Sequence, residues 1–296
     1  MPAKIDDNIR TVRDHYDRLF DLVDRASTYQ SEGFEQRPPI VNMGYWLHDT
    51  KTARAAQEQL VRELAARVSD LKGKRVVDIG CGLAGPAILL ASDHGAEVDG
   101  VNIVARQIEW ARRYIEGNDL SNQVRVHLAS AMDLPFPDRS FDVVFCLEAA
   151  HCFADKPRFL REAHRVLRRG GKLVLADIVG TTRLPFVNWQ PALKLNLVTA
   201  ADWVSMLATG GFAVEELQMI GKAVYPGCRR WAAQTAAEKR QAILVKSCRA
   251  DAPTFLKNMM MLRARFLEFL YFRSVLLLLS RLGLREFVLV SASKDV

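Results

Sequence analysis

The sequence lacks a Cys-x-x-Cys pair, an uninterrupted apolar run of membrane-spanning length and a basic segment interleaved with aromatic residues. Its five isolated cysteines do not suit a zinc ribbon or a disulfide-rich domain, so we expect buried thiols and no metal site. The longest apolar stretch, residues 267–284, contains Glu268, Arg273 and Arg281, which disfavours a transmembrane helix. The first residues include several acids and no apolar core, so we expect no signal peptide and a cytoplasmic protein.

The composition is that of an ordinary globular protein. Of the 296 residues, 49% are apolar and 25% are charged, which excludes a disordered chain and a collagen-like repeat. The net charge of +7 is uneven, because residues 220–296 hold 14 Lys and Arg against 5 Asp and Glu. This basic C-terminal part either faces an anionic partner or forms solvated helix faces. We do not expect nucleic acid as the partner, because base stacking would need interleaved aromatic residues.

Apolar periodicity predicts two N-terminal helices, over 5–25 and 50–69, followed by alternating strands and helices. Strands are predicted at 75–79, 97–102, 124–128, 141–147, 172–179 and 285–293, with one more after Gly211, and helices at 84–94, 104–117, 156–168 and 200–210. This alternation is typical of a doubly wound α/β sheet with helices on both faces. We divide the chain into an N-terminal helical lid (1–70), a ligand-binding core (71–180), a mainly helical substrate cap with a late strand (181–284) and a final strand (285–296).

A glycine-rich loop follows the first predicted strand. Gly80, Gly82 and Gly85 fit the pattern Gly-x-Gly-x-x-Gly, which lets a backbone turn tightly and approach a ligand closely. Dinucleotide-binding proteins share this pattern, so it does not decide the ligand. Asp78, two residues before the first glycine, would attract an ammonium group and repel a pyrophosphate. Asn102 ends the next strand, where a ribose contact is expected.

Several blocks in the same order resemble the class I S-adenosylmethionine-dependent methyltransferases. They are Gly80-Cys81-Gly82, residues 131–144 (AMDLPFPDRSFDVV), residues 161–171 (REAHRVLRRGG) and residues 287–294 (FVLVSASK). The resemblance implies a mostly parallel, seven-stranded Rossmann-like sheet and S-adenosyl-L-methionine as the methyl donor. It is greatest for enzymes that methylate natural products, sugars, quinols, tocopherols and sterols, because Asn42-Met43-Gly44-Tyr45-Trp46 is similar to their short aromatic motif.

The resemblance also implies which residues hold the donor. They are Tyr45, Asp78, Gly80, Cys81, Gly82, Asn102, Ile103, Gln107, Ser130, Ala131, Met132 and Glu148. Two positions depart from the family pattern: Asn102 replaces an acid that binds the ribose hydroxyls, and Ser130 replaces an aspartate that contacts the adenine amine. An amide or a hydroxyl binds these groups more weakly than a carboxylate. Tyr45 and Trp46 could instead form a hydrophobic staple between the N-terminal helices and the core.

Two residues are candidates for proton transfer. His151 follows the predicted fourth strand and Asp177 lies at the end of the fifth, and the carboxyl ends of such strands face the ligand crevice. His151 would act as the general base, and Asp177 would orient it or act itself. The alternatives are a structural histidine and a loop-capping aspartate. The resemblance assigns the base role to a histidine at this place.

The acceptor is less well specified. We expect the apolar residues of 254–284 to form a cavity wall, a core or a subunit interface. The sequence is therefore compatible with a homo-oligomer. We expect a small, hydrophobic and anionic acceptor contacted by Tyr16, Trp46, Arg229 and Arg230, with the two arginines placed after a Tyr225-Pro226-Gly227 turn. The methylated atom could be carbon, oxygen or nitrogen.

Three other functions share parts of these signals. A nicotinamide-dependent oxidoreductase would use the glycine loop but has no need for the block at 131–144. A nucleic-acid methyltransferase could use the basic C-terminal part, although Glu148-Ala149-Ala150-His151 lacks the Asn/Asp-Pro-Pro-aromatic motif of base-amine methylation. A catalytically silent module that binds the donor is the third alternative.

Overall fold

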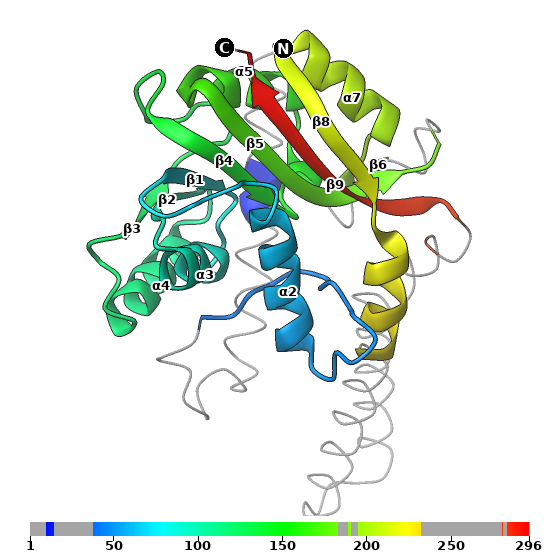
Figure 1. The fold of residues 1–296 in the computed structure, drawn as a ribbon, viewed down its shortest axis with the longest axis horizontal. Helices are drawn as coiled ribbons and strands as arrows, with labels where there is room; N and C mark the ends of the chain where they lie inside the picture. Colours follow the sequence, from blue (N-terminus) through cyan, green and yellow to red (C-terminus); the bar gives the residue numbers. More distant parts are fainter. Residues whose placement is uncertain are drawn as a thin grey trace, which may run out of the picture.

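The computed structural model describes residues 10–14, 38–182, 189–190, 195–231, 280 and 283–295. Its main feature is a seven-stranded sheet in the order β3-β2-β1-β4-β5-β9-β8 (Figure 1). The strands are β1 (Arg75–Ile79), β2 (Glu97–Asn102), β3 (Val124–Leu128), β4 (Phe141–Leu147), β5 (Leu167–Gly180), β8 (Phe212–Met219) and β9 (Arg285–Lys294). Strands β1 to β5 are parallel, whereas β9 runs antiparallel to β5 and β8 antiparallel to β9. The predicted seven-stranded, mostly parallel fold is confirmed.

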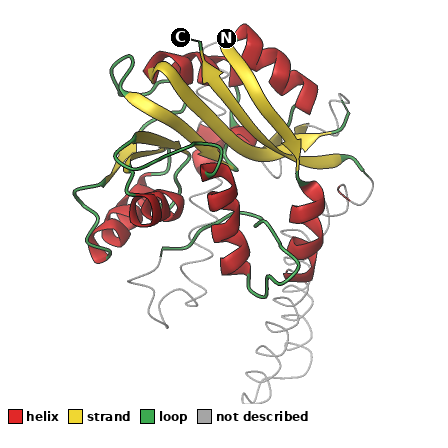
Figure 2. Ribbon diagram, viewed as in Figure 1, coloured by secondary structure: helices red, strands yellow, loops and turns green. Residues whose placement is uncertain are grey.

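Helices cover both faces of the sheet (Figure 2). Helices α2 (Ala53–Ala65), α3 (Gly85–His94) and α4 (Ala105–Gly117) share one apolar cluster with the helical residues 221–231. Helices α5 (Lys156–Val166) and α7 (Ala200–Thr209) share the other. Successive side chains of a strand point to opposite faces of the sheet. Val76 of β1 therefore belongs to the first cluster and Val77 to the second.

Some predicted boundaries differ from the structure. The predicted helix 156–168 ends at Val166, because Leu167 pairs with Phe141 and begins β5 five residues earlier than expected. The predicted helix 50–69 is shorter, since Thr52 accepts a hydrogen bond from the Ala55 N–H and caps α2. The predicted helix 5–25 lies outside the described residues except for 10–14, which are helical.

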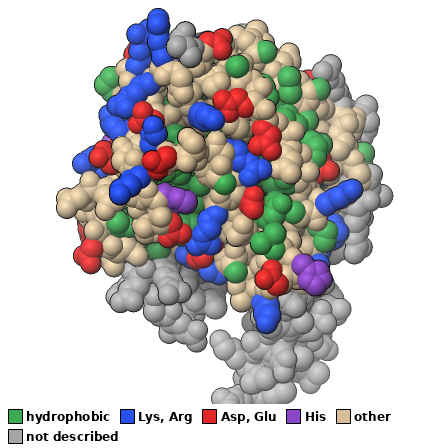
Figure 3. Space-filling model, in the orientation of Figure 1, with side chains coloured by type: hydrophobic (Ala, Val, Ile, Leu, Met, Phe, Trp, Pro, Cys, Tyr) green, Lys and Arg blue, Asp and Glu red, His purple; other side chains and the backbone are tan. Residues whose placement is uncertain are grey.

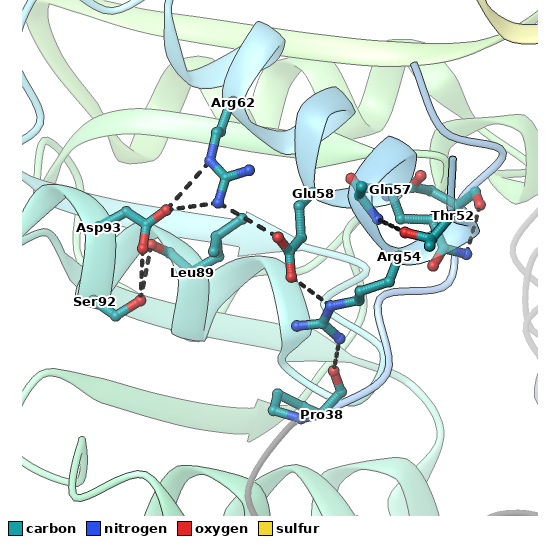
Figure 4. A network of polar contacts seen from close by, with 11 residues as sticks. Pro38, Thr52, Arg54, Gln57, Glu58, Arg62, Leu89, Ser92 and Asp93 are labelled. Atoms are coloured by element: carbon teal, nitrogen blue, oxygen red, sulfur yellow. Dashed lines mark hydrogen bonds and ion pairs between the residues drawn. The ribbon is translucent and has the colours of Figure 1, made fainter. Parts of the chain in front are cut away.

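A polar network fixes the N-terminal segment beside the sheet (Figure 4). Arg54 of α2 donates to the Pro38 carbonyl and pairs with Glu58, and Arg62 joins Glu58 to Asp93 of α3 at 3.5 and 3.1 Å. Surface ion pairs of this kind contribute little stability one by one, and here they join α2 to α3 and to the segment at Pro38. The segment that follows Pro38 crosses the glycine loop, where a Cβ on Gly85 would lie 2.6 Å from the Pro39 oxygen.

The remaining elements are short. The turn η1 (Ala150–Cys152) follows β4, and β6 (Trp189–Gln190) pairs with β7 (Leu195–Asn196). Among the described residues, no helix is both long and apolar enough to cross a membrane. Within the same ranges, no group of three or more His, Cys, Asp or Glu side chains is arranged to hold a metal ion. Lys and Arg side chains lie among Asp and Glu side chains on the face seen in Figure 3.

Candidate active site

The site lies where the strand order reverses, at the carboxyl ends of β1 and β4. Such a switch point leaves a crevice outside the sheet, which is where ligands bind in open α/β folds. Gly80 has a φ of 82°, and a Cβ there would overlap the Ala149 Cβ, so the loops after β1 and β4 touch. The Gly80 and Cys81 N–H groups both donate to the Val101 carbonyl, at 2.8 and 3.1 Å, which ties the loop to β2.

Asp78 and Gly82 show what this loop can hold. Asp78 is 1% exposed, and its Oδ2 has no hydrogen-bond partner among the described residues. Burial raises the pKa of Asp78 to about 7. A buried carboxylate oxygen of this kind needs a donor or a cation. A Cβ on Gly82 would meet nothing within 4 Å, so open space borders the loop. The loop therefore fits a ligand that carries an ammonium group.

Cys81 has a packing role for its side chain. Its Sγ lies 2.9 Å from where a Cβ on Gly100 would be, so β2 has a glycine where the thiol packs. The side chain is 3% exposed, and burial raises the pKa of the thiol well above its ordinary value. A buried, protonated thiol is a poor nucleophile, and the burial of Cys81 agrees with the expectation of buried thiols.

Asn102 forms a local network at the end of β2. Its Oδ1 accepts from the Ile103 N–H at 2.8 Å, and its Nδ2 donates to Gln107 Oε1 at 2.7 Å and to the Gly82 carbonyl at 3.4 Å. A carboxylate could not make the last two bonds. Asparagine therefore joins the glycine loop to the start of α4 in a way that the acid of the family pattern could not.

The loop after β3 contributes both a polar and an apolar part. Ser130 Oγ accepts from the Met132 N–H at 3.2 Å, and Ser130 pairs with Asp133 in an isolated bridge. Ala131 and Met132 are buried in the second apolar cluster. These contacts give the loop a defined shape beside the carboxyl ends of β2 and β3.

Glu148 connects three parts of the chain. Its backbone is left-handed, with a φ of 48°, and its Oε1 accepts from the Met43 N–H at 2.7 Å. Burial raises the pKa of Glu148 to about 8, against the opposing effects of that hydrogen bond and of His151. The carboxyl group also acts electrostatically on Tyr225 and Cys228 of the helix 221–231. Glu148 thus lies where the N-terminal segment, the sheet and that helix meet.

Tyr45 and Trp46 hold the N-terminal segment in place. The Tyr45 N–H donates to the Ala56 carbonyl at 2.8 Å, and the Trp46 N–H donates to the Ala223 carbonyl at 2.9 Å. Trp46 Nε1 donates to the Met43 carbonyl at 2.9 Å, and a Cβ on Gly227 would overlap the indole ring. These contacts join the N-terminal segment to α2 and to the helix 221–231, and the Tyr45 side chain packs against the first apolar cluster.

His151 and Asp177 form a buried pair. His151 Nδ1 lies 2.6 Å from Asp177 Oδ1, and the His151 N–H donates to Asp177 Oδ2 at 2.8 Å. The two side chains are 8% and 1% exposed. Burial lowers the pKa of His151, but the neighbouring Cys152 and the Asp177 carboxylate raise it, and the net shift is well upward. The Asp177 carboxylate holds the ring through Nδ1, and the Cys152 side chain also hydrogen-bonds to the imidazole.

Two of the predicted acceptor residues, Arg229 and Arg230, lie near the end of the helix 221–231. Arg229 Nη1 donates to Ser280 Oγ at 3.2 Å, and Arg230 is exposed. The turn predicted at Tyr225-Pro226-Gly227 is wrong, because these residues lie inside the helix 221–231, whose buried face packs on the sheet. Tyr16 lies outside the described residues.

Lys156, Tyr225 and the Met43 N–H are site features that the sequence analysis did not identify. The buried Lys156 and Tyr225 both act electrostatically on Asp177, and Met43 bonds Glu148. Of these three features, Lys156 alone had a signal in the sequence. Lysine is an unusual first residue for a helix, because its charge opposes the helix dipole there.

The comparisons with known proteins agree with this geometry. The profile of a methyltransferase domain matches residues 77–175. An O-methyltransferase from Penicillium expansum, cnsE, is 33% identical over 195 residues, which span 64% of this chain and 71% of that protein. The 27-O-demethylrifamycin SV methyltransferase of Amycolatopsis mediterranei is 40% identical over 136 residues, which span 46% of this chain and 50% of that protein.

The fold is also similar to that of a solved structure over almost the whole chain. The [4+2]-cyclase SpnF superposes with a TM-score of 0.72 at 21% identity, covering 96% of both chains. That likeness concerns the fold alone. The match to cnsE, at 33% identity over 71% of its length, shows membership of the same family. The chain belongs to the class I S-adenosylmethionine-dependent methyltransferases of small molecules.

Proposed function

We propose that this enzyme methylates a hydroxyl group of a small, mainly apolar natural product, with His151 as the general base. The observation that carries the proposal is the buried His151–Asp177 pair at 2.6 Å, at the carboxyl edge of β4 and β5. A hydroxyl nucleophile has a proton to lose, and a positioned imidazole is the usual group that takes it. The names of the two relatives, which both describe O-methyl transfer, support oxygen as the methylated atom.

The donor is assigned to the crevice at the switch point. Asp78 Oδ2 would bind the ammonium group, and the open space beside Gly82 admits the backbone of the amino acid part. Asn102 and Gln107 would bind the ribose, and residues Ser130, Ala131 and Met132 would border the adenine. Glu148 and Tyr45 would close the site from the side of the N-terminal segment.

The chemistry needs little from the protein beyond position and one proton. S-adenosylmethionine, when bound, would supply a methyl group that is activated by its positively charged sulfur, and S-adenosylhomocysteine would leave as the sulfur–methyl bond breaks. His151 Nε2 takes the proton of the acceptor hydroxyl as the new carbon–oxygen bond forms, and Asp177 stabilises the imidazolium. Because Cys152 and the Asp177 carboxylate raise the pKa of His151, the ring is a stronger base than free imidazole, and kcat/KM should rise with pH until His151 is neutral.

Donor binding is tested with a matched pair of glycine variants. Gly82 and Gly73 have φ angles of 54° and 66°, and a Cβ on either would meet nothing within 4 Å, so a leucine strains both backbones alike. Gly82→Leu should abolish the binding of S-adenosylhomocysteine in calorimetry, whereas Gly73→Leu should leave it within a few fold. Gly80 is the poorer choice, because its side chain would overlap Ala149. Equal affinities in the two leucine variants would contradict the donor site.

The base is tested with hydroxylated polyketides and phenols as acceptors and with label from the donor methyl group as the readout. His151→Ala should lower kcat by about 10²–10⁴ and leave donor affinity within a few fold. An unchanged kcat would show that His151 is structural. The anionic acceptor group, its binding by Arg229 and Arg230, the cytoplasmic location and a homo-oligomer stay predictions.

A further inference from the structure

Lys156 is a buried cation that follows the proposed base by five residues in the sequence. It is the first residue of α5 and 3% exposed, and its Nζ donates to the Phe153 carbonyl at 3.1 Å and the Asn196 carbonyl at 2.5 Å. Burial and the positive end of the helix dipole both disfavour an ammonium group here. The helix does not need it, because Asp155 caps α5 by accepting from the Arg158 N–H at 2.8 Å.

The two carbonyl partners belong to two segments that are far apart in the sequence. Phe153 follows η1 directly, and Asn196 lies in β7. Asn196 Nδ2 also donates to the Phe153 carbonyl at 3.0 Å and to the Ala154 carbonyl at 3.4 Å. Lys156 and Asn196 thus hold the backbone that leaves η1, and through it the position of His151.

The charge of Lys156 acts on the same pair of side chains. Asp177 interacts electrostatically with both His151 and Lys156. Burial lowers the pKa of Lys156 to about 8, against the opposing effects of Asp177, Cys152 and Cys146, so the group is charged at neutral pH. The other ionisable groups around the pair are Cys152 of η1, Cys146 of β4, Glu148 after β4 and Tyr225 of the helix 221–231.

We propose that Lys156 is a positioning residue whose ammonium group sets the proton affinity of His151 and fixes the η1 backbone. Its positive charge stabilises the Asp177 carboxylate and opposes a second positive charge on His151. The effect is to hold more of the ring in the neutral form, which is the form that accepts a proton. The kinetic part of this proposal rests on the proposed role of His151 as the base.

The proton affinity of His151 is measured directly by an NMR titration of the full chain labelled in its histidines. The chain has 6 histidines, and His151→Gln assigns the resonance. Lys156→Met should raise the pKa of His151 by about one unit, the usual effect of one nearby charge. Lys156→Arg, which keeps the charge, should restore it, and Arg161→Met, which removes an exposed cation from the same helix, should change nothing. If Lys156→Met does not fold, Lys156→Gln removes the charge and keeps a donor.

The pH dependence of kcat/KM then separates this proposal from the assignment of the base. In Lys156→Met the acid limb should move to higher pH by the same amount as the NMR shift, with the rate recovering in alkaline solution. A rate lowered equally at every pH, or an unshifted His151 resonance, would overturn the role of Lys156. A shifted resonance with an unmoved limb would leave Lys156 coupled to His151 and would remove His151 as the base.

Discussion

The substitution Asp177→Asn tests the base pair most sharply. The Asp177 carboxylate accepts from His151 Nδ1 at 2.6 Å, from the His151 N–H at 2.8 Å and from the Ile178 N–H at 2.7 Å. An asparagine has one acceptor oxygen, so its amide group must face one of these buried donors. An unsatisfied buried donor costs about 1–3 kcal/mol, and we expect the free energy of unfolding to fall by that amount.

The effect of Asp177→Asn on catalysis should be larger and should depend on pH. Loss of the carboxylate removes the group that orients the ring and stabilises the imidazolium, so kcat should fall by about 10²–10⁴. Because the carboxylate raises the pKa of His151, its removal should also move the acid limb of kcat/KM to lower pH. Stopped-time assays with labelled donor between pH 5.5 and pH 9.5, on the order of the range in which a histidine titrates, measure both effects.

Asp142→Asn is the matched control for this experiment. Asp142 lies at the opposite end of β4 and accepts from the Arg75 N–H at 2.8 Å and from Arg168 Nη1 at 2.7 Å. It should lose stability to a similar extent and keep both the rate and its pH profile. If the two variants lose the same fraction of activity at every pH, the carboxylate at 177 acts on folding alone, and the reasoning about the pair is refuted.

Three further predictions concern the rest of the site. Asp78→Asn should weaken S-adenosylhomocysteine binding by about ten- to a hundredfold, which is the effect of one charge-assisted bond. It should also remove the rise in affinity through pH 7 that the ionisation of Asp78 gives the wild type. Calorimetry at pH 6 and at pH 8 measures both effects, and equal affinities of the variant and the wild type would exclude Asp78 from the site. The stability of Glu148→Gln relative to the wild type should increase as pH rises from 4.5 to about 8. The reason is that Glu148 holds its proton more tightly in the folded wild type than in the unfolded chain, so the wild type loses stability over this range. Urea titrations measure the difference in unfolding free energy between the two proteins, and a difference that does not change with pH would show that Glu148 is solvated. Trp46→Ala should cost about 2 kcal/mol or more of stability by emptying the contact with Gly227, whereas Leu47→Ala, at a residue 44% exposed, should cost much less; comparable losses in thermal unfolding would contradict the staple.

The fold could be predicted from the sequence because its signals are local. Short apolar runs ending in glycine or a polar residue mark the strands, and the helices between them show their buried faces at a period of 3.6. The start of β5 could not be predicted in this way, since residues 167–171 (LRRGG) have the composition of a turn. Leu167 is extended because it pairs with Phe141, a partner far away in the sequence. The helix 221–231 contains one proline and two glycines, whose helix propensity is unfavourable. The burial of Val224, Tyr225 and Cys228 outweighs that cost.

The site could be predicted only in part, because some of its contacts join residues that are far apart in the sequence. The positions of Asp78, Asn102, His151 and Asp177 follow from the ends of the strands. The bond between His151 and Asp177, which are 26 residues apart, depends on η1 turning the ring toward β5, and the bond from Met43 to Glu148 spans 105 residues. No local pattern encodes such contacts, because they arise from packing.

The structure of this chain in complex with S-adenosylhomocysteine is the measurement that tests the methyltransferase site most directly. The account predicts the ammonium group at Asp78 Oδ2, the ribose beside Asn102 and Gln107, and the thioether sulfur facing His151 Nε2 with room for one methyl group and one hydroxyl oxygen between them. A ligand whose sulfur points away from the η1 turn, or whose ammonium group lies far from Asp78, would contradict it.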